Sequence, residues 1–428
     1  MSDLVKNEKI KQTLALTKIR RKSQQCKVFE LKIDKSKLSK NCFNKLTRLF
    51  LEAKWFYNFC ISQDHVFDFD SKIKTVLIKN KDLEFEERNL NILSSQIKQG
   101  LHSRILGSIK SEATKKKRNK GRIGKLKFKS VVNSIPLKQF DNTYKIIDKN
   151  KIQIQGIKNK IYVSGLKQIP VGAEFANANL IRRHGDFYLK VTTFVEKEIN
   201  LNNINRIGLD FGIKTQLAFS NGIKLESKIP VSKRSLLLHK NLSRSKKSNG
   251  LKSRTKNQFK IREKLVKSYE RTSNQKRDVK NKIVHELKTN FNTVAIQNEN
   301  IKAWHHGWFG KQVQESAIGG IISGIKMLPQ THVVDRFFPS TKLCPCCGKL
   351  NKIGLSERVY KCSCGYECDR DIHSATNILN EAIPTERREF KPVENSTSIL
   401  MYDRLKRIPH IKVSTCSMKQ EAQVFRLG

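Results

Sequence analysis

Cysteine spacing in the last quarter of the chain constrains its fold more tightly than any other feature. Five of the ten cysteines lie between residues 344 and 364, in the segment KLCPCCGKLNKIGLSERVYKCSCG. A C-x2-C turn at Cys344 and Cys347 is followed, fourteen residues later, by a C-x-C-G turn at Cys362 and Cys364. Such turns aim two thiolates inward, and their glycines take a conformation that other residues avoid. The pattern predicts a structural tetrahedral zinc site, since free buried cysteines would not be so dense.

The spacing defines most of the zinc ligands. We expect the ligands to be Cys344, Cys347, Cys362 and Cys364. The second turn is tighter than the usual C-x2-C, so Cys368 stays open as an alternative, and Cys346 lies outside the predicted set. In a chain without an export signal, this clustering favours metal over a disulfide framework.

The charge of the chain predicts its partner. Its 428 residues include 85 Lys and Arg against 38 Asp and Glu, for a formal net charge of +47. Codon bias toward A and T could raise the lysine content, but hardly to a two-to-one ratio of basic to acidic residues. Because the basic residues are spread along the chain, the simplest interpretation is a polyanionic partner, nucleic acid.

No export or membrane signal is visible. The start, MSDLVKNEKIKQTLALTKIRRKSQQ, lacks the uninterrupted apolar stretch of a secretory signal. No apolar run approaches the length of a membrane span. We therefore expect an intracellular protein without a membrane partner, in the cytoplasm and associated with the nucleoid of a prokaryotic-type cell.

The first half of the chain predicts a small β-barrel interrupted by helices. Residues 26–36 alternate as an edge strand does, and apolar residues then follow a helical period to about residue 61. A second helix is expected over 89–113, followed by a basic run with two glycines at 115–129. From 130 to 200, short alternating runs separated by Gly and Asn predict the strands of a barrel or sandwich.

Basic segments are candidate contacts with nucleic acid. The run at 115–129 could be a solvated linker, but in so basic a chain a loop that follows phosphates is the better interpretation. Two long basic helices are expected between about 233 and 289. The residues expected to contact nucleic acid are Lys115, Lys116, Lys117, Arg118, Lys120, Arg122, Lys125, Arg254, Lys256, Arg262 and Arg271.

From residue 204 the pattern changes to a sheet with helices. RIGLDFGIKTQLAFSNGIKLES predicts three strands, the last two joined by an Asn221-Gly222 turn. After the basic helices come a strand in NTVAIQNENI, a helix near 311–328, the strand THVVDRFF, the cysteine cluster and a helix at about 371–382. The tail 383–428 has weak periodicity, so we expect most of it to be loosely ordered.

Three acids lie at the edges of these predicted elements. Asp210 has Gly208 and Gly212 on its face of a strand, which leaves room for a metal ion and a phosphate. Glu299 follows a later strand, and Asp371 opens the last helix, where stabilisation of the helix dipole is the alternative role. Together the acids can converge at one end of a mixed sheet. That arrangement is RNase H-like and holds two Mg²⁺ ions for phosphodiester cleavage.

The strand before Glu299 leaves open which of residues 297 and 299 occupies the position of the expected acid. Gln297 stands where we would first look for the acid. Residues i and i+2 of a strand share a face, so the two side chains point the same way, about 6–7 Å apart along the chain. A slight shift at the strand end would bring Glu299 to that place. Neutral Gln297 could orient a water or a metal-bound group but could not supply the charge.

These motifs together resemble a known family. GLDFGIKT, RFFPSTKLCPCCG and CGYECDRDIHSATNIL are similar to the RuvC-type nuclease core of TnpB, the RNA-guided nuclease of insertion sequences from which compact type V CRISPR effectors descend. EAKWFYNFCI resembles the first recognition helix of that family, and the basic helices resemble its helical hairpin. The resemblance covers about residues 26–382, with the motifs in the family's order.

The resemblance implies an α+β multidomain fold. An N-terminal wedge β-barrel would carry a helical recognition insert, and a C-terminal RNase H-like (RuvC) α/β nuclease domain would carry an inserted zinc ribbon. The expected parts are 1–36 (N-terminal segment and first wedge strand), 37–129 (recognition), 130–203 (wedge), 204–340 (RuvC-like domain with the basic hairpin), 341–368 (zinc-binding insert that contacts target nucleic acid), 369–382 (last RuvC segment) and 383–428 (tail).

The resemblance also implies a function. Asp210, Glu299 and Asp371 would hold Mg²⁺ in an RNA-guided DNA endonuclease that pairs a guide RNA with double-stranded target DNA beside a short flanking motif. Two departures bear on this: QNE replaces the usual EDL, and His373 replaces the asparagine usual after the last acid. The aromatic stretch AWHHGWFGKQV fits a branch of the family in which the acid is displaced.

Two other functions fit part of the sequence. A nuclease-dead RNA-guided DNA-binding protein acting as a repressor shares every feature except a competent set of acids. A strand-joining transposase has less support, because no catalytic tyrosine or second catalytic domain is evident. The sequence leaves the oligomeric state open.

Overall fold

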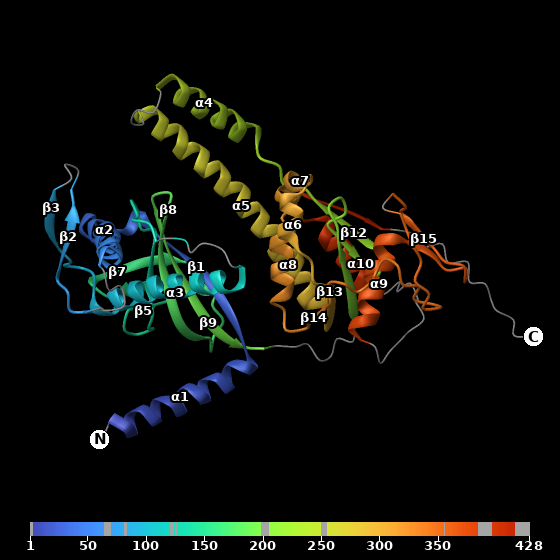
Figure 1. Cartoon of the computed structure of the whole chain (residues 1–428), viewed down its shortest axis with the longest axis horizontal. Helices are drawn as coiled ribbons and strands as arrows, with labels where there is room; N and C mark the ends of the chain where they lie inside the picture. The colour runs from blue at the N-terminus through green and yellow to red at the C-terminus, as the bar shows by residue number, and fades with distance from the viewer. Residues whose placement is uncertain are drawn as a thin grey trace, which may run out of the picture. The chain divides into compact units, whose positions relative to one another are not determined.

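The chain folds into two compact units, Met1–Lys197 and Glu198–Gly428 (Figure 1). The computed structural model describes residues 3–63, 70–80, 84–119, 124, 126–197, 205–249, 255–354, 356–383 and 396–415. Each unit has its own cluster of buried apolar side chains. Each sheet is therefore supported by a core of its own.

A seven-stranded sheet forms most of the first unit. Its strands are β1 (Gln24–Ile33), β4 (Ser134–Leu137), β5 (Tyr144–Asp148), β6 (Lys151–Ile154), β7 (Ile157–Ser164), β8 (Glu174–Arg183) and β9 (Asp186–Glu196). They pair antiparallel in the order β4-β8-β9-β1-β7-β6-β5. The expectation of an edge strand at 26–36 was therefore wrong, because β1 pairs on both sides. A central strand with one face toward solvent alternates just as an edge strand does.

The two ends of this sheet approach each other. The Tyr144 hydroxyl of β5 donates a hydrogen bond to the Ala176 carbonyl of β8 over 2.8 Å. Phe140 stacks on Phe175 of β8 with ring centroids 4.7 Å apart. The sheet is therefore nearly closed, as the short alternating runs over 130–200 suggest.

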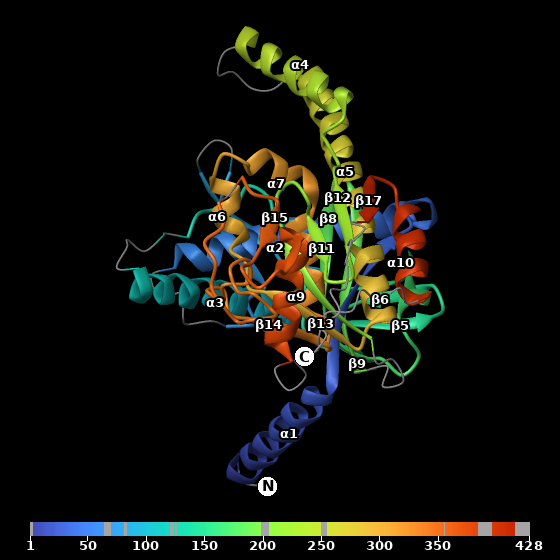
Figure 2. The same ribbon diagram turned by 90° about the vertical axis from the view of Figure 1, so that its right-hand side faces the viewer.

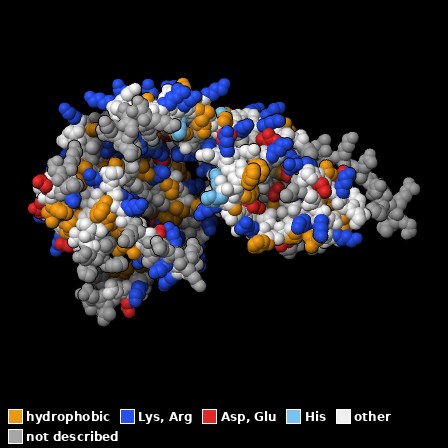
Figure 3. All heavy atoms as spheres, turned by 45° about the horizontal axis from the view of Figure 1, so that its top comes forward, with side chains coloured by type: hydrophobic (Ala, Val, Ile, Leu, Met, Phe, Trp, Pro, Cys, Tyr) orange, Lys and Arg blue, Asp and Glu red, His pale blue; other side chains and the backbone are white. Residues whose placement is uncertain are grey.

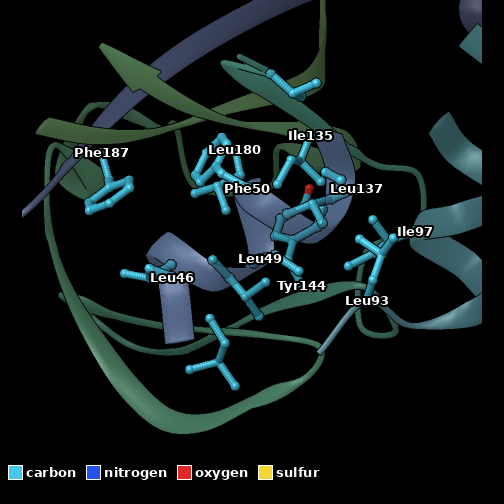
Figure 4. Close-up of a cluster of buried hydrophobic side chains, with 14 of the residues drawn as sticks. Leu46, Leu49, Phe50, Leu93, Ile97, Ile135, Leu137, Tyr144, Leu180 and Phe187 are labelled. Atoms are coloured by element: carbon cyan, nitrogen blue, oxygen red, sulfur yellow. The ribbon is translucent and has the colours of Figure 1, made fainter. Parts of the chain in front are cut away.

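Two helices and a hairpin separate β1 from β4, at the place of the expected helical insert. They are α2 (Lys40–Ser62), β2 (Thr75–Lys79), β3 (Phe85–Asn89) and α3 (Ser95–Asn119). The Ser39 side chain caps α2 by accepting a hydrogen bond from the Cys42 amide. Figure 4 shows Leu46, Leu49 and Phe50 of α2 among the buried side chains that the curved sheet surrounds.

One buried carboxylate ties α2 to the chain that enters α3. Glu52 accepts hydrogen bonds from the amides of Ile92 and Leu93, each over 2.9 Å, and pairs with Arg48. These partners satisfy a charge that would otherwise be costly to bury. The remaining elements of this unit are α1 (Asp3–Ser23) and the 3₁₀ turns η1 (Lys35–Lys37) and η2 (Leu166–Gln168).

A six-stranded mixed sheet forms the centre of the second unit. Its strands are β10 (Arg206–Phe211), β11 (Leu217–Phe219), β12 (Ile223–Ser227), β13 (Thr293–Gln297), β14 (Thr331–Val334) and β17 (Ile411–Thr415), in the order β14-β13-β10-β11-β12-β17. The β14-β13-β10 pairs are parallel and the others antiparallel. The predicted Asn221-Gly222 turn joins β11 to β12, with Gly222 at a φ of 90°.

Helices cover both faces of this sheet. The helices of this unit in the described residues are α4 (Lys233–Asn249), α5 (Lys256–Asn290), α6 (Ile301–His306), α7 (Gly310–Ser316), α8 (Ile318–Lys326), α9 (Arg370–Ala382) and α10 (Ser396–Lys406). Of these, α4 packs against α5 and not on the sheet. Val294 and Ile296 of β13 belong to the core cluster that includes α5 and α8, whereas Ala295 packs with Ile378 of α9. A separate hairpin, β15 (Val359–Lys361) and β16 (Glu367–Asp369), belongs to the cysteine-rich segment. None of the helices among the described residues has the length and apolar content that crossing a membrane requires.

Within the tail 383–428, most of which was expected to be loosely ordered, residues 396–415 form α10 and β17, while 384–395 and 416–428 lie outside the described residues. Met401 and Leu405 of α10 enter the core of the second unit, and β17 adds an antiparallel strand beside β12 (Figure 2). The partner of β17 lies far earlier in the sequence. Local periodicity could therefore not reveal this packing.

Leu405→Ala is expected to destabilise the second unit by about 2–5 kcal/mol, because a fully buried leucine side chain would be replaced by a cavity. Thermal unfolding followed by circular dichroism would show a lowered midpoint. Leu400→Ala on the same helix is the matched control, since Leu400 is 54% exposed. Equal midpoints for the two variants would contradict the packing of α10.

Candidate functional site

The contact between β10 and α9 brings two of the predicted acids together. Gly208 lies so close to α9 that a Cβ at this position would be 2.0 Å from the Ala375 carbonyl oxygen. A Cβ at Gly212 would lie 2.6 Å from the carbonyl oxygen of Thr215. The space directly beside these two glycines is therefore filled by the protein's own backbone.

The carboxyl of Asp210 has a strongly shifted pKa. Burial is the first cause of its rise to about 7, and the negative charges of Asp371 and Glu299 add to it. A hydrogen bond with the Ser374 hydroxyl acts in the opposite direction. The three predicted acids, which lie far apart in the sequence, therefore share one electrostatic environment.

Asp371 lies in the first turn of α9 and is held from two sides. The Asp369 side chain caps the helix, accepting hydrogen bonds from the amides of Asp371 (3.0 Å) and Ile372 (3.3 Å). Lys224 of β12 places its ammonium 2.7 Å from the Asp369 carboxylate and 3.2 Å from that of Asp371. This half-buried lysine offsets part of the negative charge of the acids.

Glu299 lies two residues beyond β13, next to basic side chains. Burial raises its pKa, while the charges of Arg336 and Lys326 and a hydrogen bond from the Asn300 amide lower it. Lys326 also donates a hydrogen bond to the Asn298 side chain over 2.8 Å. Glu299 is therefore a partly buried acid with cations on one side and Asp210 within electrostatic reach.

Gln297 has a different role from the one expected. Its amide nitrogen lies 3.1, 3.2 and 2.8 Å from the carbonyl oxygens of Asp335, Arg336 and Phe338, and its Oε1 accepts a hydrogen bond from the Ser340 hydroxyl over 3.0 Å. The side chain, only 6% exposed, therefore holds the loop after β14 and does not orient a water or a metal-bound group. A carboxylate here would face three carbonyl oxygens, which disfavours the charged form.

A series of buried hydroxyl and amide side chains, in contact with one another, links Gln297 to α9. The hydroxyls of Ser340 and Ser374 lie 2.9 Å apart, and Ser374 in turn contacts Asp210. Asn377 of α9 donates to the carbonyls of Ser340 and Leu343, each over 2.7 Å. The loop after β14 is therefore bonded to the helix that carries Asp371.

His373 connects α9 with the cysteine-rich segment. Its ring stacks on Tyr360 of β15 with centroids 3.7 Å apart, and its Nε2 lies 3.1 Å from the Asn377 amide nitrogen. Burial lowers the pKa of His373 to about 4, so the ring is neutral near pH 7. The histidine that departs from the family's usual asparagine thus packs against the segment that holds the cysteines.

The four predicted cysteine ligands lie together. The sulfur atoms of Cys344 and Cys364 are 3.6 Å apart, those of Cys347 and Cys362 are 3.5 Å apart, and all four lie within 4.8 Å of one another. A tetrahedral ion with metal–sulfur bonds of about 2.3 Å requires separations of about 3.8 Å, so the set can hold one metal ion. Within the described ranges no other group of three or more His, Cys, Asp or Glu side chains is gathered this tightly.

The structure also decides between the alternative ligands. Cys346 is exposed and lies outside the set, and so does Cys368, which is buried on β16. The two turn glycines, Gly348 and Gly365, have φ values of 71° and 89°. Both turns therefore use the left-handed conformation that the sequence pattern predicts.

The predicted phosphate contacts fall only partly within the described residues. Lys115, Lys116 and Lys117 are exposed on α3, and Lys256, Arg262 and Arg271 are exposed on α5. By helical period, Lys256 and Arg271 share a face of α5 and Arg262 lies on another. Figure 3 shows Lys and Arg side chains spread widely over one face of the molecule. Outside the described residues lie Lys120, Arg122, Lys125, Arg254 and the side chain of Arg118.

Three residues of the site were not predicted from the sequence. Asp369 had a detectable signal, because an acid just before a helix is a common N-cap. Lys224 and Ser374 had none, since their contacts with Asp371 and Asp210 join separate elements.

Comparison with known proteins gives one family model and several relatives. A family model described as Cas12f1-like, TNB domain, matches residues 329–378, which include the four cysteines and Asp371. A Streptomyces pristinaespiralis protein named "Putative RNA-guided DNA endonuclease" is 28% identical over 181 residues, 40% of this chain and 44% of that protein. TnpB-like protein L79 of Acanthamoeba polyphaga mimivirus is 29% identical over 139 residues, 29% of this chain and 26% of that protein. The chain thus spans less than half the length of these curated relatives.

Asp210→Asn is expected to stabilise the second unit at about pH 8 and to have little effect near pH 4. The pKa of about 7 in the folded protein exceeds the value of about 3.9 in the unfolded chain, so ionising Asp210 weakens the fold as the pH rises between these values. Asparagine cannot ionise and avoids this loss. Thermal midpoints at both pH values, without divalent cations, measure the effect.

The control for this experiment is Asp403→Asn on the exposed side of α10. It should leave the midpoint nearly unchanged at both pH values. A stabilisation by Asp210→Asn that is larger at low pH than at high pH would contradict the raised pKa of Asp210.

Proposed function

Because the chain belongs to the TnpB-like family, we propose that it is an RNA-guided DNA endonuclease. The observation that carries the proposal is the shared electrostatic environment of Asp210, Glu299 and Asp371 on a mixed sheet. An acid near the end of one strand, an acid just after the neighbouring parallel strand and a third on a helix packed against them are the arrangement expected of a RuvC-type, RNase H-like nuclease. Guide pairing would select the target, beside a short flanking motif.

In this proposal the three acids are the catalytic metal ligands. Two Mg²⁺ ions, when bound, would activate the attacking water and stabilise the leaving 3′ oxygen. Asp210 must lose its proton to act as a ligand, because metal ions bind the ionised carboxylate. Lys224 holds Asp371 and Asp369 in position from β12. Arg336 and Lys326 beside Glu299 can attract the phosphate backbone of the strand to be cut.

We favour an active nuclease over a nuclease-dead DNA-binding repressor. Burial and the nearby charges of Asp371 and Glu299 raise the pKa of Asp210, so its ionisation weakens the fold as the pH rises toward neutral. Gln297 is bonded to the carbonyls of the loop after β14, whereas Glu299 is a partly buried acid that lies near the charges of Arg336 and Lys326. Both facts suit a site that binds metal.

The other parts of the chain would bind the guide RNA and the target DNA. The nearly closed sheet would be the wedge, α2 to α3 the recognition insert, and residues 341–368 a zinc-binding insert that contacts target nucleic acid. The basic side chains on α3 and α5 would contact phosphates of the guide RNA and the target DNA, so binding should weaken with salt. The working place would be the nucleoid of a prokaryotic-type cell.

The cysteine set would hold structural zinc. Four thiolates with no further ligand position form a closed site of the kind that zinc occupies in structural centres. The bound ion would stabilise the segment that packs on α9 through His373 and Tyr360.

Asp210→Ala, Glu299→Ala and Asp371→Ala are each expected to lower target cleavage by about 100-fold or more, because each removes a charged ligand of the metal ions. The measurement is Mg²⁺-dependent cleavage of a DNA library by the purified ribonucleoprotein, alongside target binding by the same samples. Binding should persist in all three variants. Wild-type protein that binds its target but never cuts would instead establish the nuclease-dead alternative.

A double variant separates the two glutamate positions. Gln297→Glu combined with Glu299→Gln should remain inactive, because a side chain at 297 is directed at the carbonyls of the loop after β14. Circular dichroism and metal content would establish that the variant folds. Restored cleavage would contradict the assignment of Glu299.

Cys364→Ser should reduce bound zinc from about one ion per chain to nearly none, since three thiolates hold the ion far more weakly than four. Elemental analysis of purified protein measures the ion. Cys346→Ser is the matched control, because Cys346 lies outside the ligand set, and it should keep its zinc. Equal zinc in both variants would disprove the assignment of the ligands.

A further inference from the structure

The turn between α6 and α7 exposes two adjacent aromatic side chains. Trp308 is 101% exposed and Phe309 is 51% exposed. Aromatic side chains of this size usually contribute their large apolar area to a core or an interface. Among the described residues Trp55 is buried, at 7% exposure, so the exposure of Trp308 is not general for tryptophan in this chain. Two exposed neighbours of this kind indicate a contact surface.

The backbone presents these two side chains on a defined turn. The Gly307 amide donates to the Ala303 carbonyl over 3.2 Å, and the Gly310 amide donates to the Gly307 carbonyl over 3.1 Å. A Cβ at Gly310 would lie 2.5 Å from the His305 carbonyl oxygen, so glycine is needed for the two helices to meet this closely. The aromatic pair therefore lies at the apex of a compact, hydrogen-bonded turn.

The turn is anchored in the core of the second unit, near Glu299. Ile301 and Trp304 of α6 and Val313 of α7 pack in the same core cluster as β10 and β13. α6 begins two residues after Glu299 and, with six residues, is about 9 Å long. One short helix thus separates the exposed pair from a proposed metal ligand.

Charge around the turn suits a nucleic acid. Residues 300–314 contain no Asp or Glu, and they include Lys302 and Lys311, both exposed. Exposed aromatic rings between basic side chains are how proteins bind single strands without sequence preference, because bases stack on the rings and phosphates pair with the cations.

We propose that Trp308 and Phe309 form a stacking surface for unpaired bases of the DNA strand whose backbone enters the carboxylate site. The occupant is single-stranded DNA, chosen from the proposed function together with the basic, acid-free surroundings of the pair. The surface would hold the strand next to Glu299 without reading its sequence.

Tryptophan fluorescence tests this directly on the full chain, without guide RNA and without divalent cations. The probe is a short single-stranded oligothymidylate, at salt high enough to weaken the phosphate contacts of the basic helices. Trp308 should be quenched as the oligonucleotide binds. Trp308→Ala should weaken binding by about tenfold, measured by anisotropy of a labelled oligonucleotide, which is about 1.4 kcal/mol.

Two further variants make the assignment specific. Trp308→Phe should lose most of the quenching yet keep most of the affinity, because phenylalanine still offers a ring. Leu400→Ala, which removes an exposed apolar side chain from α10, should change neither quantity. Binding and quenching that are unchanged in Trp308→Ala would overturn the proposal. Loss of self-association in Trp308→Ala, with strand binding intact, would likewise overturn it and assign the surface to a second copy of the chain.

The experiment is separable from the test of the endonuclease. No cleavage is measured, so the stacking surface can fail while Asp210, Glu299 and Asp371 prove catalytic. Conversely, quenching can be observed in a protein that never cuts DNA.

Discussion

The close approach of α9 to β10 at Gly208 is the contact on which the rest of the second unit depends. Because the Ala375 backbone occupies the space where a Cβ would lie, the helix comes near enough for Ser374 to reach Asp210. The same approach places Asp371 beside Lys224 and lets Asn377 hold the loop after β14. Replacing Gly208 with any other residue would move all of these groups together.

The acids show a conflict between stability and proposed function. Burial, together with the charges of Asp371 and Glu299, raises the pKa of Asp210 to about 7, which a protein selected for stability alone would avoid. Around them the polar groups are bonded: Gln297, Ser340 and Asn377 form contacts of 2.7–3.2 Å with each other or with loop carbonyls. A satisfied buried network of this kind can hold acids close to one another in a fixed geometry.

The sequence predicted the strands, turns and helices whose formation depends on residues close together in the chain. The alternating runs became strands, Asn221-Gly222 became the predicted turn, and the helical periods of the basic segments became α4 and α5. The failures concern pairing between distant segments: β1 is central and not an edge strand, and β17 joins β12 from a tail expected to be loosely ordered. Hydrogen-bond partners in a sheet are chosen across the whole chain, so alternation in one segment cannot identify them.

The sequence by itself determined the chemistry available to this protein: a strongly basic chain, four thiolates in two short turns, and three acids that end or begin regular elements. Short turns hold their ligands through local backbone conformation, which is why the cysteine set could be predicted almost completely. Only the tertiary structure decided that Cys368 lies outside that set and that Lys224 pairs with Asp371. It also decided that Gln297 bonds to a loop, whereas the charge of Glu299 influences Asp210. The reason is physical: which side chains meet depends on how separate strands and helices pack, and neighbours in sequence with nearly identical propensities can end on different sides of that packing.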